Sequence, residues 1–302
     1  MSTSRLRLLD NTRIGEVRRA IRGWYRTNAR DLPWRRTSDP YRILVSEIML
    51  QQTQVQRVIP KYRAFLVRFP TLRALATASL ADVLRMWSGL GYNVRAKRLW
   101  ECAMFVVAHH GSRIPSDIET LRALPGIGRY TASAVASFAF GAHEAVADVN
   151  VRRVLARALL GRESIDDATA WWLAERALPR DHASTWSQAL MDVGARFCRP
   201  APDCAACPAR RACASSARGG APAIRERKAK RSEKFVGSRR YYRGRVVRAL
   251  AGARSLRLHV LGEQVKDGFA TTDLPWLRSL LADLEREGLI ALNARHDRAA
   301  LP

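Results

Sequence analysis

The sequence predicts an all-α fold, and three observations lead to that prediction. Through most of the first 215 residues, apolar side chains recur three and four positions apart, the spacing of a buried helix face. No stretch in that part alternates convincingly between apolar and polar residues, as a half-buried strand would. The segment 121–151 reads as a helix, a tight turn and a second helix, followed by an extended run that reaches Asp148 at the start of the next helix.

Apolar periodicity also predicts the helices on either side of this segment. Before it, helices are expected over residues 14–25, 41–50, 53–69, 79–87 and 92–110. After it, helices are expected over residues 150–160, 168–177 and 183–197. Pro60 falls within the range 53–69, so it is expected to lie in that helix or to kink it.

The turn inside the central segment has the composition of an anion site. Pro125, Gly126 and Gly128 end the first helix and supply turn geometry. The backbone N–H groups of residues 127–130 then lie bare at a helix N-terminus, where an anion such as a phosphate can bind, and Arg129 adds a positive charge. Taken alone, this pattern is equally typical of an ordinary helix–helix turn.

Charge and composition indicate the kind of partner. The chain has 52 Lys and Arg against 27 Asp and Glu, a net charge of +25, which favours a polyanionic partner such as nucleic acid. No apolar run approaches the roughly 20 residues that a membrane-spanning helix needs. The N-terminus has no apolar core typical of a signal peptide, so we expect a cytoplasmic protein, associated with the nucleoid in a bacterium or archaeon.

Four of the five cysteines form a cluster with the spacing C-x5-C-x2-C-x5-C, at Cys198, Cys204, Cys207 and Cys213. Four thiolates on a short loop can hold a tetrahedral zinc ion or an iron–sulfur cluster, and the spacing favours neither. The odd total argues against a disulfide framework. Cys102 lies on an apolar helix face and is expected to be inert core.

Six motifs stand in one order along residues 12–213. They are DLPWR at 31–35, VSEIMLQQTQV at 45–55, WSGLGY at 87–92, LPGIGRYTA at 124–132, DVNVRRVLAR at 148–157 and QALMDVGARFC at 188–198. Together they resemble the adenine DNA glycosylases (MutY type, A/G-specific) of the endonuclease III-like helix-hairpin-helix iron–sulfur superfamily. The resemblance implies a monofunctional enzyme of base excision repair, which hydrolyses the N-glycosidic bond of adenine mispaired with 8-oxoguanine or guanine.

The resemblance also implies a division of the chain. Residues 41–148 would form a six-helix barrel that carries the helix-hairpin-helix, and residues 1–40 with 149–216 an iron–sulfur helical domain. The basic, polar stretch 217–240 is expected to be a linker. Residues 241–302 are expected to form a small, winged-helix-like C-terminal domain. Its expected elements are helices near 243–250 and 274–287 and a strand within LIALN.

The same resemblance implies a cofactor and places the chain in one branch of the superfamily. The family holds a [4Fe–4S] cluster on four cysteines after its last core helix, although its first gap has six residues where this chain has five. Bifunctional relatives carry a lysine in the hairpin, where this chain has Tyr130, and a phenol cannot form an imine. Glu47, with Gln51 and Gln52, is characteristic of the adenine-removing branch.

Two acids can divide the chemistry of base removal. Glu47 has apolar neighbours on its helix, which would raise its pKa and let it donate a proton to adenine N7. Asp148 lies at helix N-terminal N–H groups, which favour its ionised form, so it can stabilise or attack the cationic sugar. Tyr130 could hydrogen-bond near either acid. The competing interpretations are a structural acid for Glu47 and a plain N-cap for Asp148.

The expected partner is double-stranded DNA that contains a mismatch. We expect the protein to bind this DNA as a monomer and not to associate with a membrane. A base inside a duplex must be flipped out before it can react. The resemblance assigns filling of the resulting gap to Gln52 and Tyr92, with Gln51 beside them, and ordering of the catalytic pocket to Asn150. The backbone at Gly126 and Gly128, with Arg129, would bind phosphate.

Two alternatives stay open. One is a thymine or uracil mismatch glycosylase of the same superfamily, which would also carry tyrosine at position 130 but tends to lack the glutamine pair of LQQTQ. The other is a non-catalytic iron–sulfur DNA-binding protein, against which the presence of both Glu47 and Asp148 argues. The family's well-known members read 8-oxoguanine with a long C-terminal domain of the nucleotide-hydrolase fold. The tail here does not resemble that domain, so the preferred opposite base is left open.

Overall fold

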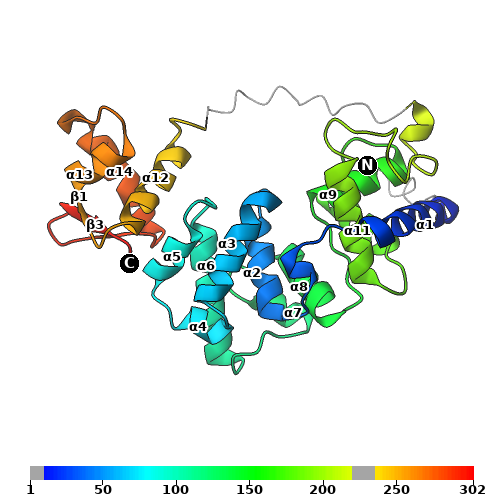
Figure 1. The fold of residues 1–302 in the computed structure, drawn as a ribbon, viewed down its shortest axis with the longest axis horizontal. Coiled ribbons are helices and arrows are strands. Elements are labelled where there is room, and N and C mark those ends of the chain that lie inside the picture. The colour runs from blue at the N-terminus through cyan, green and yellow to red at the C-terminus, as the bar shows by residue number, and fades with distance from the viewer. Residues whose placement is uncertain (1–9, 220–234) are drawn as a thin grey trace. The chain divides into compact units, whose positions relative to one another are not determined.

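The computed structural model describes residues 10–219 and 235–302 (Figure 1). Between residues 10 and 219 it is helical and contains no strand, so the all-α prediction for this part is confirmed. The elements there are α1 (Asn11–Asn28), η2 (Pro33–Arg35), α2 (Pro40–Leu50), α3 (Val55–Arg68), α4 (Leu72–Ala76), α5 (Leu80–Trp87), α6 (Val94–His109), α7 (Ile118–Ala123), α8 (Arg129–Phe140), α9 (Val149–Leu155), η3 (Ala156–Leu160), α10 (Asp167–Arg176), α11 (Ala183–Arg196) and η4 (Ser216–Arg218).

The boundaries differ from the predictions in a few places, each for a local reason. Helix α3 begins at Val55 because Gln52, with a φ of 52°, interrupts the helical backbone before it. The predicted helix over 150–160 is divided into α9 and the π-helical turn η3, which ends at Gly161. The five-residue α4 is too short to show periodicity and was not predicted.

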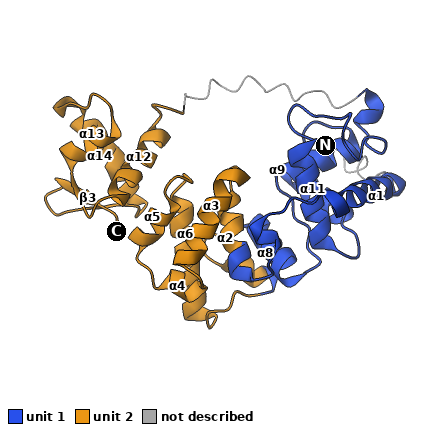
Figure 2. Ribbon diagram, viewed as in Figure 1, with its two compact units in different colours: residues 1–43, 116–118, 128–229 blue, residues 44–115, 119–127, 230–302 orange. Residues whose placement is uncertain are grey.

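Two compact units divide the chain (Figure 2). Unit 1 comprises residues 1–43, 116–118 and 128–229, and unit 2 comprises residues 44–115, 119–127 and 230–302. The domain boundaries expected from the resemblance stay a prediction. Most of the predicted linker, residues 220–234, lies outside the described residues.

In unit 1, helix α11 packs against α1 and α9, and α10 packs against α9. The shared core is aliphatic and aromatic, and includes Ile14, Ile21, Val154, Leu155, Trp186, Leu190 and Val193. Gly194 lets α11 approach α9 closely, because a Cβ there would meet the Cβ of Asn150 at 2.6 Å. This approach places the start of α9 against the middle of the unit.

In unit 2, α6 packs against α4 and α5, and α3 packs against α5. Phe65 contacts Phe69 and Trp87 edge-on, with ring centroids 4.9 and 6.2 Å apart. Leu99 and Cys102 of α6 are fully buried in the same core, which agrees with an inert role for this cysteine.

The tail module (residues 235–302) contains both helices and a small sheet. Its elements are α12 (Arg239–Ala251), β1 (Leu256–Arg257), α13 (Leu258–Val265), η5 (Thr271–Asp273), α14 (Leu274–Arg286), β2 (Ala291–Leu292) and β3 (Arg298–Ala300). The strands are antiparallel in the order β1-β3-β2, with Ala299 opposite both Leu256 and Leu292. The two predicted helices are present, and α13 is additional. Assignment of the module as a winged helix stays a prediction.

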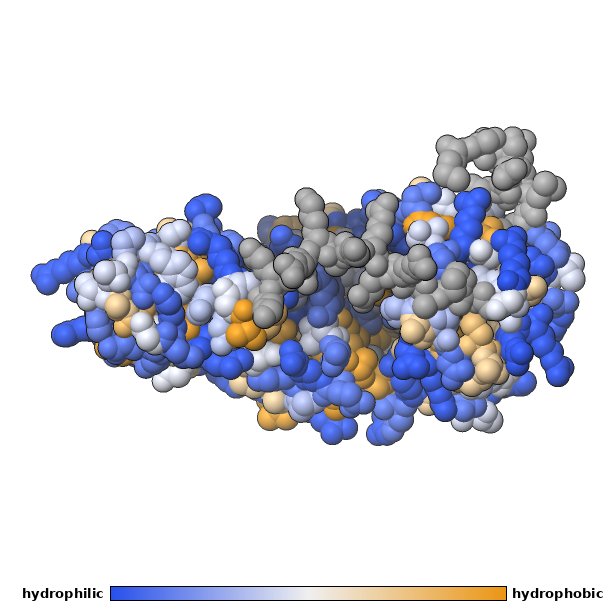
Figure 3. Space-filling view, turned by 90° about the horizontal axis from the view of Figure 1, so that it is seen from above, coloured by the Kyte–Doolittle hydropathy of each residue, from blue (hydrophilic) through white to orange (hydrophobic). Residues whose placement is uncertain are grey.

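The surface reflects the charge of the chain. On the face shown in Figure 3, hydrophilic residues predominate over hydrophobic ones. Among residues 10–219 and 235–302, none of the helices has both the length and the apolar character that crossing a bilayer requires.

Candidate active site

The hairpin turn between α7 and α8 has the backbone that the sequence predicts. Gly126 has a φ of 74°, and a Cβ there would meet the Cβ of Arg98 at 2.8 Å. A side chain at this position would therefore be strained in its backbone and would also clash. The Ile127 N–H donates to the Leu124 carbonyl at 3.1 Å, and Gly128 begins α8 without a side-chain cap. The first N–H groups of α8 therefore have no N-cap side chain to which they could donate.

The structure holds Arg129 in place through contacts that the sequence did not indicate. Its Nη2 donates to Glu175 Oε1 at 2.8 Å, and its guanidinium lies 4.0 Å from the centroid of the Trp171 ring. All three side chains belong to unit 1. The cation at the hairpin is therefore oriented before any ligand arrives.

Asp148 is the N-cap of α9. Its Oδ1 accepts from the Val151 N–H at 2.7 Å and its Oδ2 from Asn150 Nδ2 at 2.8 Å. Burial raises the pKa of this carboxyl, and the hydrogen bonds from Val151 and Asn150, with the charge of Arg153, oppose that rise only in part. The expectation that the helix terminus favours the ionised form is thus outweighed by desolvation.

A chain of hydrogen bonds connects Asp148 to the first cysteine of the cluster. Asn150, bonded to Asp148, accepts from Arg153 Nη2 at 2.8 Å. The same Arg153 donates to the Gly194 carbonyl at 2.9 Å and, through Nε, to the Cys198 carbonyl. Sequence reasoning missed Arg153, although it lies within the DVNVRRVLAR motif.

The cysteine loop follows α11, as predicted. Burial raises the pKa of the Cys207 thiol to about 12, and negative charge on Cys198, Cys213 and Cys204 adds to the rise. Such thiols need a nearby cation to ionise. Within the described part of the chain, no three ligating side chains are gathered closely enough to hold a metal ion.

The donor chemistry around this loop nevertheless fits a thiolate-bound group. Arg157, whose side chain is 1% exposed, donates through Nη1 to Cys198 Sγ at 3.7 Å and to the Arg199 carbonyl at 2.7 Å. Its Nε is buried without a hydrogen-bond partner among the described residues. Its Nη2 is paired with Glu163 Oε2 at 2.8 Å, so the guanidinium gives the Cys198 sulfur a charge-assisted hydrogen bond but no uncompensated positive charge.

Glu47 has the apolar helix neighbours that the sequence predicts, and the catalytic roles of Glu47 and Tyr130 stay predictions. Glu47 is 5% exposed on α2, in unit 2, with buried Ile43, Leu44 and Ile48 on the same helix. Tyr130 lies in the first turn of α8, in unit 1, and packs half-buried against the core of that unit.

Gln52 and Tyr92 share a rare backbone conformation. Their φ angles are 52° and 48°, in the left-handed region that side-chain-bearing residues seldom adopt. Both side chains are exposed, and Gln51 precedes Gln52 in the turn after α2. Strain of this kind persists only where surrounding structure imposes it, and it gathers at functional sites.

Arg95 imposes that structure on both turns. Its Nη1 donates to the carbonyls of Ile48 at 2.8 Å and Gln51, and its Nη2 donates to Thr53 Oγ1 at 3.0 Å and the Gly91 carbonyl at 3.2 Å. Burial lowers the pKa of the guanidinium to about 10, so it stays charged at neutral pH.

A sequence signal for Arg95 was available. It precedes Leu99, Cys102 and Val106 by four, seven and eleven positions, so it falls on the apolar face of α6. An arginine on a buried face requires several acceptors, and here the acceptors are the turns that carry Gln52 and Tyr92.

Comparison with known proteins identifies the family of the chain. A family model described as "HhH-GPD superfamily base excision DNA repair protein" matches residues 45–171. The adenine DNA glycosylase of Mycobacterium tuberculosis is 44% identical over 244 residues, which cover 76% of this chain and 77% of the relative. The human adenine DNA glycosylase is 41% identical over 218 residues, 68% of this chain and 40% of the relative.

Among solved structures, a thermostable thymine-DNA glycosylase is similar with a TM-score of 0.65 and 31% identity, covering 69% of this chain and 98% of that one. The similarity to the mycobacterial relative is higher in identity and spans three quarters of both chains. The chain belongs to the adenine DNA glycosylases of the helix-hairpin-helix superfamily of base-excision DNA repair proteins.

Proposed function

We propose that the protein removes adenine from mismatched duplex DNA by hydrolysing the N-glycosidic bond, and that it leaves an abasic site. The observation that carries this proposal is the similarity to adenine DNA glycosylases over three quarters of the chain, together with a family match over residues 45–171 that includes Glu47 and Asp148. We also propose that the base opposite the adenine is guanine or 8-oxoguanine.

The two acids would share the reaction. Glu47, withdrawn from water on α2, would donate a proton to N7 of the flipped adenine and make the base a better leaving group. Asp148, fixed by the bonds from Val151 and Asn150, would face the positive charge that develops on the sugar as the bond breaks. Water would then bond through its oxygen to the sugar carbon that lost adenine, and its released proton would go to Glu47, which the first step left ionised. Tyr130 supplies a phenol rather than an amine, so no imine with the sugar forms.

The assay that tests this function uses duplexes with A, T or U opposite G or 8-oxoguanine. We expect release of adenine and an abasic strand that breaks only after treatment with alkali. Release of thymine or uracil instead would support the thymine/uracil alternative, and binding without any release would support a non-catalytic protein.

The pH dependence of excision should follow the ionisation of Asp148. Burial raises the pKa of Asp148 above the roughly 3.9 of an exposed aspartate. As the pH is lowered, Asp148 therefore becomes protonated, and so inactive, at a higher pH than an exposed aspartate would. We expect the single-turnover rate to fall as the pH is lowered through that pKa. A rate that is constant down to about pH 4, with the protein still folded by circular dichroism, would contradict this role.

We also propose that Cys198, Cys204, Cys207 and Cys213 hold a [4Fe–4S] cluster, with the buried Arg157 donating a hydrogen bond to the Cys198 sulfur. When bound, such a cluster would supply a one-electron redox centre and a cross-link for the loop after α11.

Metal analysis of the purified protein should therefore find about four irons and four sulfides per chain, with a brown colour. Serine in place of Cys207 should lower both contents together. One zinc per chain with no iron would replace this assignment by a structural zinc site.

A further inference from the structure

Helix α1 carries five arginines and a single acid along its 18 residues. Its apolar side chains face the core of unit 1, where four of them are buried. The arginines at positions 18, 22 and 26 are spaced by four residues, so they form one line along the helix beside the buried face, and the arginine at position 19 lies next to that line. We call these four residues the α1 stripe: Arg18, Arg19, Arg22 and Arg26.

No acid in the described part of the chain neutralises the α1 stripe. Other arginines of unit 1 are paired, for example Arg129 with Glu175 at 2.8 Å. None of the four stripe arginines forms an ion pair with a described residue. Like charges four positions apart on a helix repel each other and destabilise it. The stripe therefore retains a repulsion that a bound anion would relieve.

The structure holds the first arginine of the stripe in place. Arg18 Nη2 donates to the carbonyls of Ala177 at 3.0 Å and Leu178 at 3.4 Å, just after the end of α10. Its Nε is buried and has no hydrogen-bond partner among the described residues. Burial lowers the pKa of Arg18, and the positive charges of Arg22 and Arg176 lower it further. Positive charge thus gathers here, beside a buried donor that has no acceptor.

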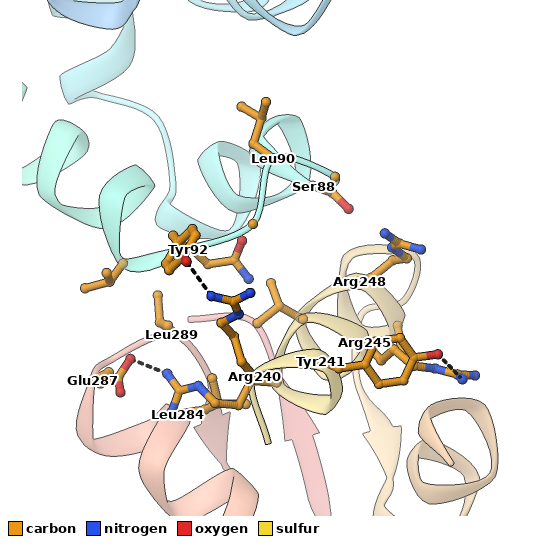
Figure 4. Close-up of a pocket in the computed structure, with 18 of the residues that line it drawn as sticks. Ser88, Leu90, Tyr92, Arg240, Tyr241, Arg245, Arg248, Leu284, Glu287 and Leu289 are labelled. Atoms are coloured by element: carbon orange, nitrogen blue, oxygen red, sulfur yellow. Dashed lines mark hydrogen bonds and ion pairs between the residues drawn. The ribbon is translucent and has the colours of Figure 1, made fainter. Parts of the chain in front are cut away.

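A second basic surface is the groove between the turn after α5 and helix α12, within unit 2 (Figure 4). The arginines there include side chains that already have partners. Arg243 is paired with Glu287, and Figure 4 shows Arg240 donating to Tyr92. Of the two surfaces, the α1 stripe is therefore the one whose charge no described acid offsets.

The α1 stripe points away from the hairpin. Helix α11 packs against both α1 and α8, and Figure 2 shows α1 and α8 on opposite sides of α11. The buried side of α1 faces α11, since Tyr25 Oη donates to Gln188 Oε1 of α11 at 3.0 Å. The face with the stripe therefore points away from α8. A straight duplex held at the start of α8 would not touch it.

The composition of α1 favours DNA over a protein as the ligand. Protein interfaces depend on aromatic or aliphatic anchors, and α1 exposes no large hydrophobic side chain. Its Trp24 packs edge-on against Phe197, with ring centroids 5.4 Å apart. A line of arginines without apolar surface suits the phosphates of DNA, which bind through charge and independently of sequence.

We propose that the α1 stripe binds the phosphates of a second duplex segment while a first segment occupies the hairpin and the catalytic pocket. The inference rests on the proposed function, because it takes duplex DNA as the substrate. The enzyme would then pass from one DNA segment to another without first dissociating into solution. Binding at the stripe would be independent of sequence and of any mismatch, since contacts to phosphates carry no sequence information.

A binding assay on the full chain can detect the second segment. The stripe variant combines Arg19→Gln, Arg22→Gln and Arg26→Gln, because glutamine is a good helix former and Arg18 keeps its bonds to the end of α10. The protein is saturated with a duplex that carries a tetrahydrofuran abasic analogue opposite guanine, and an undamaged duplex with a second dye is then titrated at several salt concentrations. The matched control variant replaces three exposed arginines of the tail module by glutamine: Arg254, Arg278 and Arg295.

Wild-type protein and the control should form a complex that contains both dyes. Four phosphate contacts at about 0.9 each predict a slope of log K against log salt of about −3.6 for the undamaged duplex, and the stripe variant should retain only about −0.9. Arg26→Gln alone should reduce the magnitude of the slope by about 0.9, which tests the stripe with a milder change. Equal affinity of the stripe variant and the control for the abasic-analogue duplex would show that the stripe variant is folded. Absence of the two-dye complex with wild-type protein would overturn the proposal and leave an acidic protein as the ligand of the stripe.

Dissociation kinetics measure the transfer itself. A labelled abasic-analogue duplex is released from the protein into increasing concentrations of undamaged duplex. The rate should rise with that concentration for wild-type protein and the control, because transfer passes through the complex with two duplexes, and it should stay constant for the stripe variant. Equal dependence in the stripe variant and the control would overturn the proposal. Adenine release by wild-type protein separates the two inferences: release with a constant dissociation rate contradicts the stripe alone, whereas a rising rate without release contradicts the proposed function alone.

Discussion

Glu47→Gln and Asp148→Asn should each abolish adenine removal while leaving affinity for DNA nearly unchanged. Glutamine cannot supply the proton that Glu47 would donate, and a general acid typically contributes about 10²–10⁴-fold to the rate. Asp148 meets a positive sugar only as the bond breaks, so loss of its charge affects the transition state more than the bound ground state. Single-turnover excision of adenine opposite 8-oxoguanine measures both losses.

The structure offers good controls for these two variants. Asparagine is also a favourable N-cap, so Asp148→Asn should keep the start of α9 and the fold. Glu16→Gln removes an exposed acid from α1 and should excise at the wild-type rate. Retained affinity for an abasic-analogue duplex would show that an inactive variant is folded. Wild-type excision by Glu47→Gln would make Glu47 a structural acid.

The parts of the site that follow from local sequence were predictable. The glycines of the hairpin, the cap at Asp148 and the apolar neighbours of Glu47 are each set within a few residues, so spacing and residue type suffice. For the same reason the helices agree with apolar periodicity wherever they are long enough to show it.

The parts that depend on packing were not predictable. The hydrogen bonds at the start of α9 lower the pKa of Asp148, whereas burial raises it by more. Only the helix start can be recognised in the sequence, because burial depends on how the chain packs. Arg153 and Arg157 bind carbonyls around Cys198, more than forty positions away. From sequence alone an arginine is expected to be exposed on the surface. The carbonyls that accept its hydrogen bonds can be identified only from the tertiary structure.

Arg95→Met should weaken DNA binding strongly, because Arg95 joins the two turns that present Gln52 and Tyr92. Methionine keeps much of the volume but removes the donors, which leaves the Ile48 carbonyl without this partner, while the Gln51 carbonyl keeps the Thr53 hydroxyl as a donor at 3.2 Å. Each buried acceptor without a partner costs about 1–3 kcal/mol, so the free energy of unfolding should also fall. The left-handed conformations of Gln52 and Tyr92 would then lose their support and relax.

The measurement has to separate loosened turns from general loss of stability. Arg63→Met is the matched control, because Arg63 is an exposed arginine of helix α3 in the same unit. Limited proteolysis under native conditions should cleave Arg95→Met within residues 50–53 and 88–92 faster than the control, while the far-ultraviolet circular dichroism of both stays native. Arg95→Lys should recover affinity only partly, since one ammonium cannot reach acceptors on both turns at once. Equal affinity of Arg95→Met and Arg63→Met for the abasic-analogue duplex would mean that the turns keep their shape without Arg95, and that Gln52 and Tyr92 are held by their own backbone.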